Sequence, residues 1–481
     1  MSKKVNKLYT VPILLLLTLL FCVGFYFLPR LIPGTGMKQV DMLADIRTGS
    51  DSLSLESLRV KLAEEARLDS IAYRDSIMRA AGADSLIILK RDSLYRAMIA
   101  EQDSDSSFVA IEDFSSGHQA LKDFFAALNR RNELGRPVRV AFLGDSFIEG
   151  DILVADVRHG LQERYGGRGV GFVPVTTPAA QFRATVETRA GGWKTYSILT
   201  NRKMPFTLSG MLFEPSEENA WVSLKSTNRY PELKPVNSFK LIYDGSVATD
   251  IMLTSRSMKD TLRRSLPETN AIAQFEVTGN FSDVKLSLTK TSGLRMVGLV
   301  MEDNTGVIVD NYSLRGNSGT PLARMNMAKC HELNNVRPYD LIILQYGLNV
   351  ASDSMFHYDW YTRKMSAALQ HLKTCFPEAD ILLLGVSDRC SHSANGFRTM
   401  PGVLALLNEQ KKLARDAGIA FWNLFLAMGG EGSMSRYVSW NWASKDYTHI
   451  SYRGGRTIAE SLLKALDNEK RFYDEAGKMV E

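Results

Sequence analysis

The sequence predicts an α/β protein with a parallel sheet covered on both faces, an inserted antiparallel β-sandwich, and an N-terminal transmembrane helix followed by a helical stalk. Short apolar runs alternate with amphipathic stretches in two parts of the chain, which is typical of parallel strands joined by helices. Between those parts, helical periodicity gives way to alternating runs separated by turn residues. Near the N-terminus stands an apolar run about long enough to cross a bilayer as a helix.

The apolar run covers residues 8–28, with three lysines before it and Arg30 after it. A basic N-terminus stays in the cytoplasm, so the rest of the chain is expected outside. We therefore predict a cytoplasmic tip and an uncleaved single-pass anchor over residues 1–35. A cleaved signal peptide is the alternative, but the run is long for one and no small-x-small site follows closely.

The composition limits the class of protein. The chain has 481 residues, 45% of them hydrophobic, which is enough for two or three structural units with a sizeable core. The net charge of +5 is small and spread along the chain, without a basic patch interleaved with aromatic residues, so nucleic acid is not an expected partner.

The cysteines do not have metal-ligand spacing. They are Cys22, Cys330, Cys375 and Cys390. An exported location permits one disulfide, although the sequence does not choose the pair. Buried free thiols are the alternative.

Residues 36–107 are rich in Asp, Ser, Arg, Leu and Ala, and Asp-Ser pairs recur along them. The apolar face of their helical stretches is narrow and interrupted. We interpret them as a partly helical stalk or linker between the anchor and the working domain. A coiled-coil partner site is the alternative, but regular heptads are missing.

Residues 108–180 are expected to form the first part of the α/β domain. A helix is predicted over 120–134, followed by a buried strand over 138–143 that stops at Gly-Asp-Ser146. A small residue before the serine permits a tight turn, which leaves Oγ exposed at the carboxyl end of the strand. Ligands bind at that edge of open α/β sheets.

Residues 181–305 are expected to form the inserted antiparallel β-sandwich, which resembles carbohydrate-binding modules. In the run 284–289, for example, Val and Leu alternate with polar residues. Aromatic residues of this insert could stack on sugar rings, although each of them is a core residue in the alternative interpretation. They are Trp193, Tyr196, Trp221 and Tyr230.

The α/β pattern resumes over residues 306–481, the second part of the domain. The expected strands are 306–309, 341–344, 381–384 and 419–422. The expected helices are 360–372, 403–413 and 458–466. Near the end, Asp446 stands three residues before His449, so its carboxylate can orient the imidazole within one turn and leave the other ring nitrogen facing a nucleophile.

Four blocks occur in a fixed order: Ser146 in Gly-Asp-Ser, glycines after the second strand, Gly-x-Asn349 after the third, and Asp446-x-x-His449. Together they resemble the GDSL, or SGNH, hydrolase family. Ile-x-Gly-Asp after the serine and the glycine-rich loop over 165–172 are similar to the bacterial peptidoglycan O-acetyl esterases and transferases. Those relatives usually have His after the serine, where this chain has Phe147.

The resemblance implies a role for each matching residue. Ser146 would be the nucleophile, His449 the general base and Asp446 the residue that orients the imidazole. The oxyanion hole would comprise the N–H of Ser146, the N–H of Gly319, with Gly316 as the alternative, and the amide of Asn349. This chemistry needs no metal or cofactor. Weaker candidates for substrate binding are Trp193, Asp388, Trp440 and Trp442.

The function implied is a serine esterase at a bacterial inner membrane, with its catalytic domain in the periplasm, that removes O-acetyl groups from peptidoglycan or another exported glycan. One alternative is an O-acetyltransferase that passes acetyl from a multi-span membrane acyltransferase to a glycan, because water and a sugar hydroxyl attack the same acyl-enzyme. A second alternative is a glycan-binding protein without catalytic activity.

Overall fold

The computed structural model describes residues 85–102, 108–247, 249–290, 293–393 and 396–478. The chain divides into two units, residues 1–73 and 74–481, and the first lies wholly outside the described residues. The predicted anchor and most of the predicted stalk therefore lie outside them too. Among the residues described, no helix combines the length and the apolar character needed to span a membrane.

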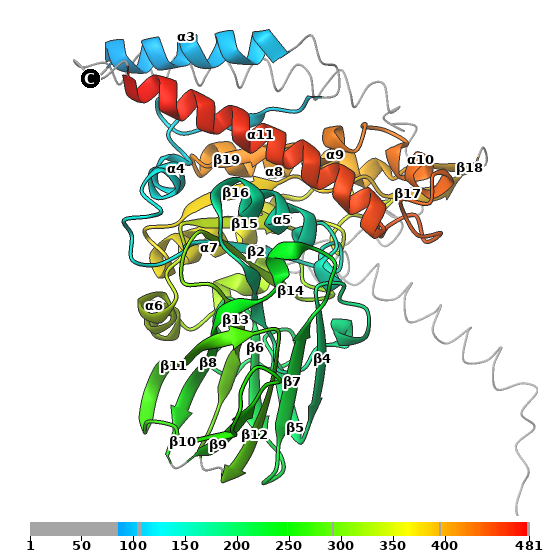
Figure 1. The fold of residues 1–481 in the computed structure, drawn as a ribbon. Helices are drawn as coiled ribbons and strands as arrows, with labels where there is room; N and C mark the ends of the chain where they lie inside the picture. The colour runs from blue at the N-terminus through cyan, green and yellow to red at the C-terminus, as the bar shows by residue number, and fades with distance from the viewer. Residues whose placement is uncertain (1–84, 103–107, 248, 291–292, 394–395, 479–481) are drawn as a thin grey trace, which may run out of the picture. The chain divides into compact units, whose positions relative to one another are not determined.

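The central sheet has six strands in the order β1-β19-β16-β15-β2-β14 (Figure 1). The strands are β1 Ile111–Asp113, β2 Val138–Gly144, β14 Val307–Ser313, β15 Leu341–Gln345, β16 Asp380–Leu384 and β19 Ala420–Trp422. All neighbours run parallel except β1, which pairs antiparallel with β19. The α/β class is confirmed, and the prediction of a purely parallel sheet is wrong at this one edge.

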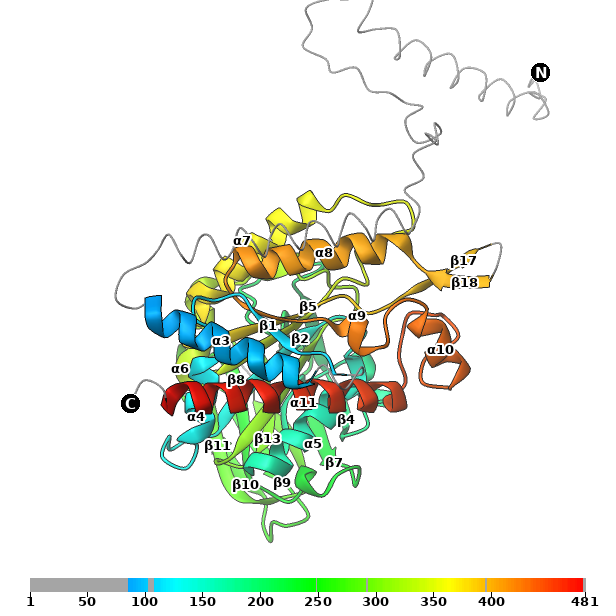
Figure 2. The ribbon, with the colours of Figure 1, turned by 90° about the horizontal axis from the view of Figure 1, so that it is seen from above.

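Helices cover both faces of the central sheet (Figure 2). One face carries α4 Lys122–Asn129, α5 Val154–Tyr165 and α11 Tyr452–Lys478, and the other carries α7 Asp359–Cys375 and α8 Pro401–Asp416. Every residue of β2 is buried, as expected for a parallel strand between two helical layers. Three more helices are α6 Met327–Val336, α9 Leu424–Ala427 and α10 Ser433–Ser439.

Helix α3, Ser85–Gln102, belongs to the stretch that the sequence predicted as stalk. Its Met98 is buried together with Phe472 and Ala476 of α11. Its Tyr95 stacks on His118, with ring centroids 4.0 Å apart. This part of the predicted stalk is therefore docked on the folded domain rather than extended away from it.

The antiparallel strands from β4 to β13 form two sheets, ordered β10-β9-β12-β7-β4 and β11-β8-β13-β6-β5. They are β4 Val186–Gly191, β5 Trp193–Ser197, β6 Met211–Pro215, β7 Trp221–Ser226, β8 Val236–Ser246, β9 Asp250–Thr254, β10 Leu262–Ser265, β11 Thr269–Phe281, β12 Asp283–Lys290 and β13 Met296–Glu302. The two sheets share one apolar core, to which alternate residues of β12 contribute Val284, Leu286 and Leu288. Strand β3, Gly169–Val173, pairs with β13, so most of the segment predicted as a glycine-rich loop is a strand that joins a sandwich sheet.

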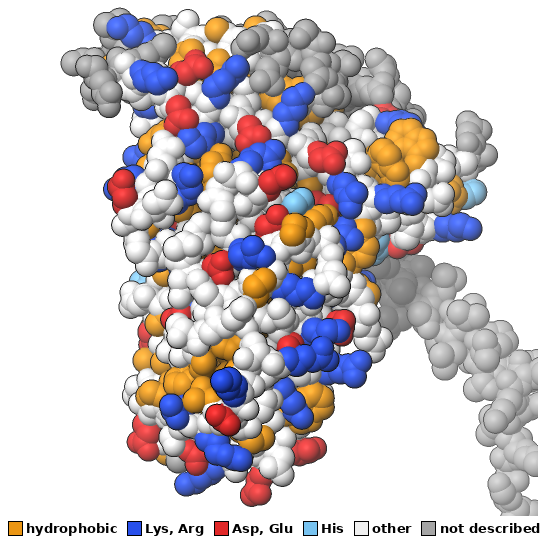
Figure 3. Space-filling model, in the orientation of Figure 1, with side chains coloured by type: hydrophobic (Ala, Val, Ile, Leu, Met, Phe, Trp, Pro, Cys, Tyr) orange, Lys and Arg blue, Asp and Glu red, His pale blue; other side chains and the backbone are white. Residues whose placement is uncertain are grey.

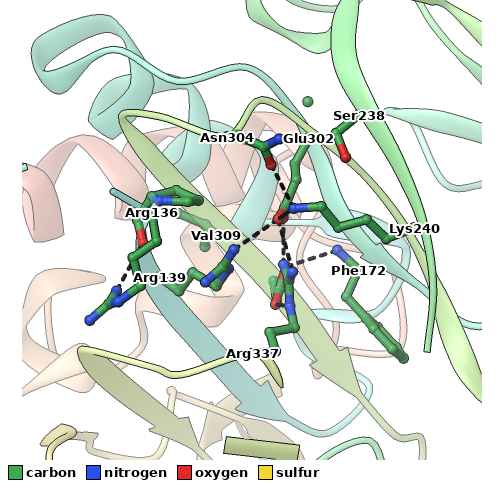
Figure 4. Close-up of polar contacts among 12 residues, drawn as sticks. Arg136, Arg139, Phe172, Ser238, Lys240, Glu302, Asn304, Val309 and Arg337 are labelled. Atoms are coloured by element: carbon green, nitrogen blue, oxygen red, sulfur yellow. Dashed lines mark hydrogen bonds and ion pairs between the residues drawn. The ribbon is translucent and has the colours of Figure 1, made fainter. Parts of the chain in front are cut away.

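A buried ion cluster joins the sandwich to the α/β part (Figure 4). Glu302 at the end of β13 accepts hydrogen bonds from Arg337 at 2.6 and 3.0 Å, from Lys240 at 3.0 Å and from Arg139 of β2 at 3.1 Å. Arg337 also bonds both carboxylate oxygens of Asp310 in β14, at 2.7 and 2.8 Å. The carboxylate of Glu302 is fully buried, so these cations fix the position of the sandwich on the central sheet.

Candidate active site

Ser146 lies at the carboxyl end of β2, on the sharp turn that the sequence predicts. A Cβ atom at Gly144 would lie 2.8 Å from the Ile148 side chain and 2.9 Å from the carbonyl oxygen of Gln345 in β15, so this position requires glycine. Ser146 is 8% exposed. Among the described residues, its backbone N–H has no acceptor. The turn thus presents a hydroxyl and a free N–H at the same point.

His449 and Asp446 complete a hydrogen-bonded chain with this serine. The Ser146 Oγ lies 2.8 Å from His449 Nε2, and His449 Nδ1 lies 2.7 Å from Asp446 Oδ2. A carboxylate only accepts, so Nδ1 carries the proton and Nε2 of the neutral ring accepts from the serine hydroxyl. Residues 303 positions apart in the chain are therefore arranged as nucleophile, base and orienting acid.

The second oxygen of Asp446 builds the turn that carries the histidine. Oδ1 accepts the backbone N–H of Thr448 at 2.9 Å and of His449 at 3.0 Å, and the Ser444 hydroxyl at 2.6 Å. Burial alone would raise the pKa of Asp446, but these hydrogen bonds and that of the imidazole outweigh it and lower the pKa well below its usual range. The carboxylate is therefore ionised whenever the imidazole needs its proton held at Nδ1.

A two-stranded hairpin supports this turn from outside. It consists of β17 Cys390–Ser393 and β18 Gly396–Thr399. Phe397 stacks flat on Tyr447, with ring centroids 3.5 Å apart, and the Cys390 N–H donates to the Tyr447 carbonyl at 3.1 Å. Tyr447 has a φ of +54°, an unfavourable conformation for a tyrosine, so these contacts stabilise a strained turn beside the histidine.

The prediction that Gly319 contributes to the oxyanion hole is wrong. Its N–H donates to the side-chain oxygen of Asn317 at 2.9 Å, and its Cα faces the side chains of Met365 and Tyr346. Gly316, the alternative, has a φ of +79°, open space where a Cβ would be and, among the described residues, no acceptor for its N–H. Gly316 is therefore the glycine that can donate to an oxyanion.

Asn349 lies beside the serine turn with both amide hydrogens engaged. Its Nδ2 donates to Asp145 Oδ2 and to the Asn317 carbonyl, each at 3.0 Å. Asn349 can therefore donate to an oxyanion only by sharing one N–H between its present acceptor and the oxyanion, in a three-centre bond. Asp145 also accepts the N–H of Phe147 at 2.9 Å, and burial raises its pKa to about 6.

Two acids whose partners sequence reasoning missed connect the serine turn to β14 and to the loop of Gly316 that follows it. Glu149 is buried and pairs with Arg315, whose Nε lies 2.8 Å from Oε2. Asp151 is wholly buried and accepts the Asn311 amide at 2.8 Å. The Gly-Asp pair after the serine was the sequence feature that could have indicated this role. The residues that bond the two acids, however, lie about 160 positions later in the chain.

Asp388 is not a substrate-binding residue, contrary to the sequence prediction. It is wholly buried and accepts the Thr399 hydroxyl at 2.8 Å, the Met434 N–H at 2.7 Å and the Ser433 hydroxyl at 3.2 Å. These bonds fasten the β17–β18 hairpin to α10. Asp388 therefore acts on the site only through the elements that hold the histidine turn.

The predicted substrate-binding tryptophans lie in two different places. Trp440 is 49% exposed at the end of α10 and contacts Trp442 edge to face at 4.9 Å. Trp442 adjoins the histidine turn, because its carbonyl accepts the Ser451 N–H at 2.7 Å. Trp193 lies on β5 of the sandwich, remote from α10 in Figure 1, and its ring N–H donates to a carbonyl at 2.9 Å. The structure does not bring Trp193 to the catalytic residues.

His159 of α5 and the cysteines are not among the catalytic residues. His159 stacks on Tyr230, with ring centroids 4.1 Å apart, and bonds Glu232 at 2.9 Å. Cys330, Cys375 and Cys390 are buried free thiols. In the described part of the chain, no group of three or more His, Cys, Asp or Glu side chains is arranged to hold a metal ion.

Comparison with known proteins gives a likeness of fold. No protein-family model matches the sequence, and no curated protein does. A solved structure described as a peptidoglycan O-acetylesterase in action superposes with a TM-score of 0.63 at 20% identity, over 75% of this chain and 99% of that one. The chain has the fold of that esterase. This likeness of fold agrees with the sequence motifs, which resemble those of peptidoglycan O-acetyl esterases.

Two family two carbohydrate esterases are also found, with lower scores. The enzyme from Cellvibrio japonicus has a TM-score of 0.25 at 9% identity, over 60% of this chain and 99% of that one. The enzyme from Clostridium thermocellum, in complex with cellohexaose, has a TM-score of 0.27 at 10% identity, over 58% of this chain and the whole of that one.

Proposed function

We propose that the protein is a serine esterase that removes O-acetyl groups from a glycan through an acetyl-Ser146 intermediate. One observation carries the proposal: Ser146, His449 and Asp446 are joined by hydrogen bonds of 2.8 and 2.7 Å at the carboxyl edge of a parallel sheet. That geometry provides a nucleophile, a proton acceptor and a carboxylate that fixes the tautomer.

In the first half-reaction, Ser146 Oγ attacks the ester carbonyl carbon while its proton moves to His449 Nε2. The carbonyl oxygen becomes an oxyanion that accepts the N–H groups of Ser146 and Gly316, with Asn349 sharing a third donor. Asp446 stabilises the imidazolium that forms. The C–O bond to the sugar then breaks, the sugar oxygen takes the proton from Nε2, and acetyl-Ser146 remains.

In the second half-reaction, water replaces the sugar on the same path. His449 Nε2 takes a proton from the water as its oxygen attacks the acetyl carbon. The bond to Oγ breaks, Oγ regains the proton and acetate leaves. A sugar hydroxyl in place of water would give acetyl transfer, so the ratio of the two products measures esterase against transferase activity.

The proposed substrate is an exported glycan, with peptidoglycan as the first choice. Support comes from the O-acetylesterase whose fold the chain shares and from the sequence motifs that resemble the peptidoglycan branch. An anchor over residues 8–28 would hold the domain at the outer face of the inner membrane, beside this substrate, and beside a membrane acyltransferase if acetyl is transferred. That segment lies outside the described residues.

The test is release of acetate from O-acetylated peptidoglycan, O-acetylated xylan and aryl acetates, by the unaltered protein and by Ser146→Ala. The variant should lose activity by about 10³-fold or more on every ester, because Ser146 is the one hydroxyl among the described residues that is hydrogen-bonded to the His449 imidazole. Ser439→Ala, which changes an exposed serine of α10 outside this hydrogen-bonded chain, is the control and should keep most activity. Full activity of Ser146→Ala would overturn the proposal.

A further inference from the structure

A polar cavity of about 380 Å³ lies at the end of the β-sandwich that adjoins the α/β part. The cavity is lined by the end of β7, the segment just before β8, the β9–β10 loop and the turn between β11 and β12. Its size is that of a site for one or two sugar residues. The polar side chains that line it include Lys225, Lys234, Arg256, Asn280, Ser282 and Asp283.

The cavity carries an excess of positive charge. Lys225 is paired with Glu187 at 3.0 Å, and Asp283 accepts the backbone N–H of Arg256 at 3.4 Å. Lys234 Nζ uses one hydrogen on the Ser226 carbonyl, at 3.2 Å, which leaves two for a ligand. In the described part of the chain, no acceptor is found for the exposed guanidinium of Arg256. Two cations are thus available to one bound anion.

The surroundings favour an anion of a polymer rather than a small free ion. Figure 3 shows several lysine and arginine side chains exposed in the region of β7 and β4. Arg189 and Lys285 are exposed there, opposite Ser223 on either side of β7. Together with the two cations of the cavity, these side chains attract a strand that carries repeated negative charges.

The cavity is also fixed relative to the catalytic domain. Arg168, before β3, donates to the carbonyls of Lys234 at 2.7 Å and Pro235 at 3.0 Å. Farther along the surface, Arg229 lies over the ring of Tyr452, 4.7 Å from its centroid. Tyr452 donates to the Gly150 carbonyl, at 2.9 Å, on the serine turn. Tyr452 thus connects Arg229, which stands five residues before Lys234 in the chain, with the serine turn.

We propose that this cavity binds a carboxylate carried by the glycan that the Ser146 centre deacetylates, and so holds the polymer while one of its esters is cleaved. The inference rests on the proposed function for the identity of the polymer. Lys234 and Arg256 bind the carboxylate, and the side chains of Asn280 and Ser282 donate to neighbouring sugar oxygens. The carboxylate belongs either to the sugar itself, as in a uronate or a lactyl ether, or to a peptide attached to it.

Binding is measured by calorimetry with Ser146→Ala protein, so that no ester is consumed. The probes are solubilised O-acetylated peptidoglycan strands, the same strands with their carboxyl groups amidated, strands without peptides, acetylated glucuronoxylan and acetylated cellulose. The cavity variant is Lys234→Ala/Arg256→Ala. The matched control is Arg263→Ala/Arg264→Ala, which removes two exposed cations of β10 on the same sheet but outside the cavity.

We expect the cavity variant to weaken binding of the acidic strands about tenfold or more, because charge-assisted hydrogen bonds are lost. Amidation should weaken binding equally, and the control should change it less than about twofold. Strands without peptides separate the two carboxylate sources. Added salt should reduce binding of the unaltered cavity more than that of the variant. Equal affinity for native and amidated strands, or an unchanged cavity variant, would overturn the inference.

A kinetic measurement separates this inference from the proposed function. With Ser146 restored, the cavity variant should raise KM for the acidic polymer and leave kcat/KM for aryl acetates unchanged, which also shows that it is folded. Absence of esterase activity in the unaltered protein, together with carboxylate-dependent binding, would reject the proposed function and keep the cavity. Normal esterase activity together with binding that does not depend on carboxylates would keep the proposed function and reject the cavity as a carboxylate site.

Discussion

Asp446 uses its two carboxylate oxygens for different purposes. Oδ1 accepts backbone N–H groups and shapes the turn, whereas Oδ2 accepts only the imidazole proton of His449. The same residue therefore sets both the position and the tautomer of the base. A substitution that keeps the bonds to the backbone N–H groups but places a donor opposite His449 Nδ1 separates the effect on position from the effect on the tautomer.

Asp446→Asn is such a substitution. Its amide oxygen can still accept the backbone N–H groups, but its NH₂ group would face His449 Nδ1 and force the proton onto Nε2, where it blocks proton transfer from Ser146. We expect kcat for aryl acetates to fall about 10³–10⁴-fold with little change in fold. Circular dichroism and steady-state kinetics check this. A loss below tenfold would contradict the role of Asp446.

At the scale of elements, the site depends on how the loop after β14 is held against the turn after β2. Arg315 directly precedes Gly316 and pairs with the buried Glu149 of the serine turn, although Arg315 itself is 56% exposed. Asp151 and Asn311 make a second connection, between the serine turn and β14 itself. These bonds position the N–H of Gly316 relative to Ser146.

Arg315→Met tests this connection. The change leaves the Glu149 carboxylate without its cation, so the loop should shift and the oxyanion should lose alignment with its donors. We expect kcat to fall about tenfold with KM nearly unchanged, since small displacements of catalytic groups are costly. Arg315→Lys should restore part of the loss. Arg202→Met, an exposed position outside the site, is the control; an unchanged kcat for Arg315→Met would refute the positioning role.

The elements that the sequence predicts best are those buried on both faces. The strands β2, β15 and β16 are mostly apolar, and their expected bounds agree with the observed ones to within one residue. The strand β1 is only Ile-Glu-Asp, so no run of apolar residues marks it. Its existence depends on pairing with β19, about 310 positions later, which no local pattern encodes.

The site residues follow the same rule. Ser146, Asp446 and His449 are predictable because each stands in a short motif whose chemistry is local. The choice between Gly316 and Gly319 cannot be predicted in this way, because it depends on which backbone N–H the Asn317 side chain accepts. Asp388 follows a strand end like the true site residues, but its partners stand 11, 45 and 46 positions later and bury it.

At the scale of the whole molecule, the Glu302 cluster holds the sandwich on the central sheet. Burial by itself would raise the pKa of Glu302, but Arg337, Arg139 and Lys240 outweigh burial and lower the pKa well below its usual range. A carboxyl whose pKa is lowered on folding stabilises the protein above its unfolded pKa of 4.5, and this contribution is lost as the pH falls below that value.

Glu302→Gln should therefore destabilise the protein by about 3–5 kcal/mol at pH 7, because three buried cations lose their shared anion. The difference from the unaltered protein should shrink as the pH falls below 4.5. Thermal unfolding at several pH values measures it. Glu276→Gln, at the exposed rim of the cluster, is the control and should cost much less. A pH-independent difference would contradict the ionic role of Glu302.

The proposed reaction requires that Ser146 be the group that carries the acetyl. Its most direct test is reaction with a fluorophosphonate, followed by mass spectrometry of the digested protein. We expect a single adduct on the peptide that contains Ser146, and its loss in His449→Ala, where no base activates the hydroxyl. Labelling of another residue, or no labelling of a protein that still hydrolyses acetate esters, would contradict the account.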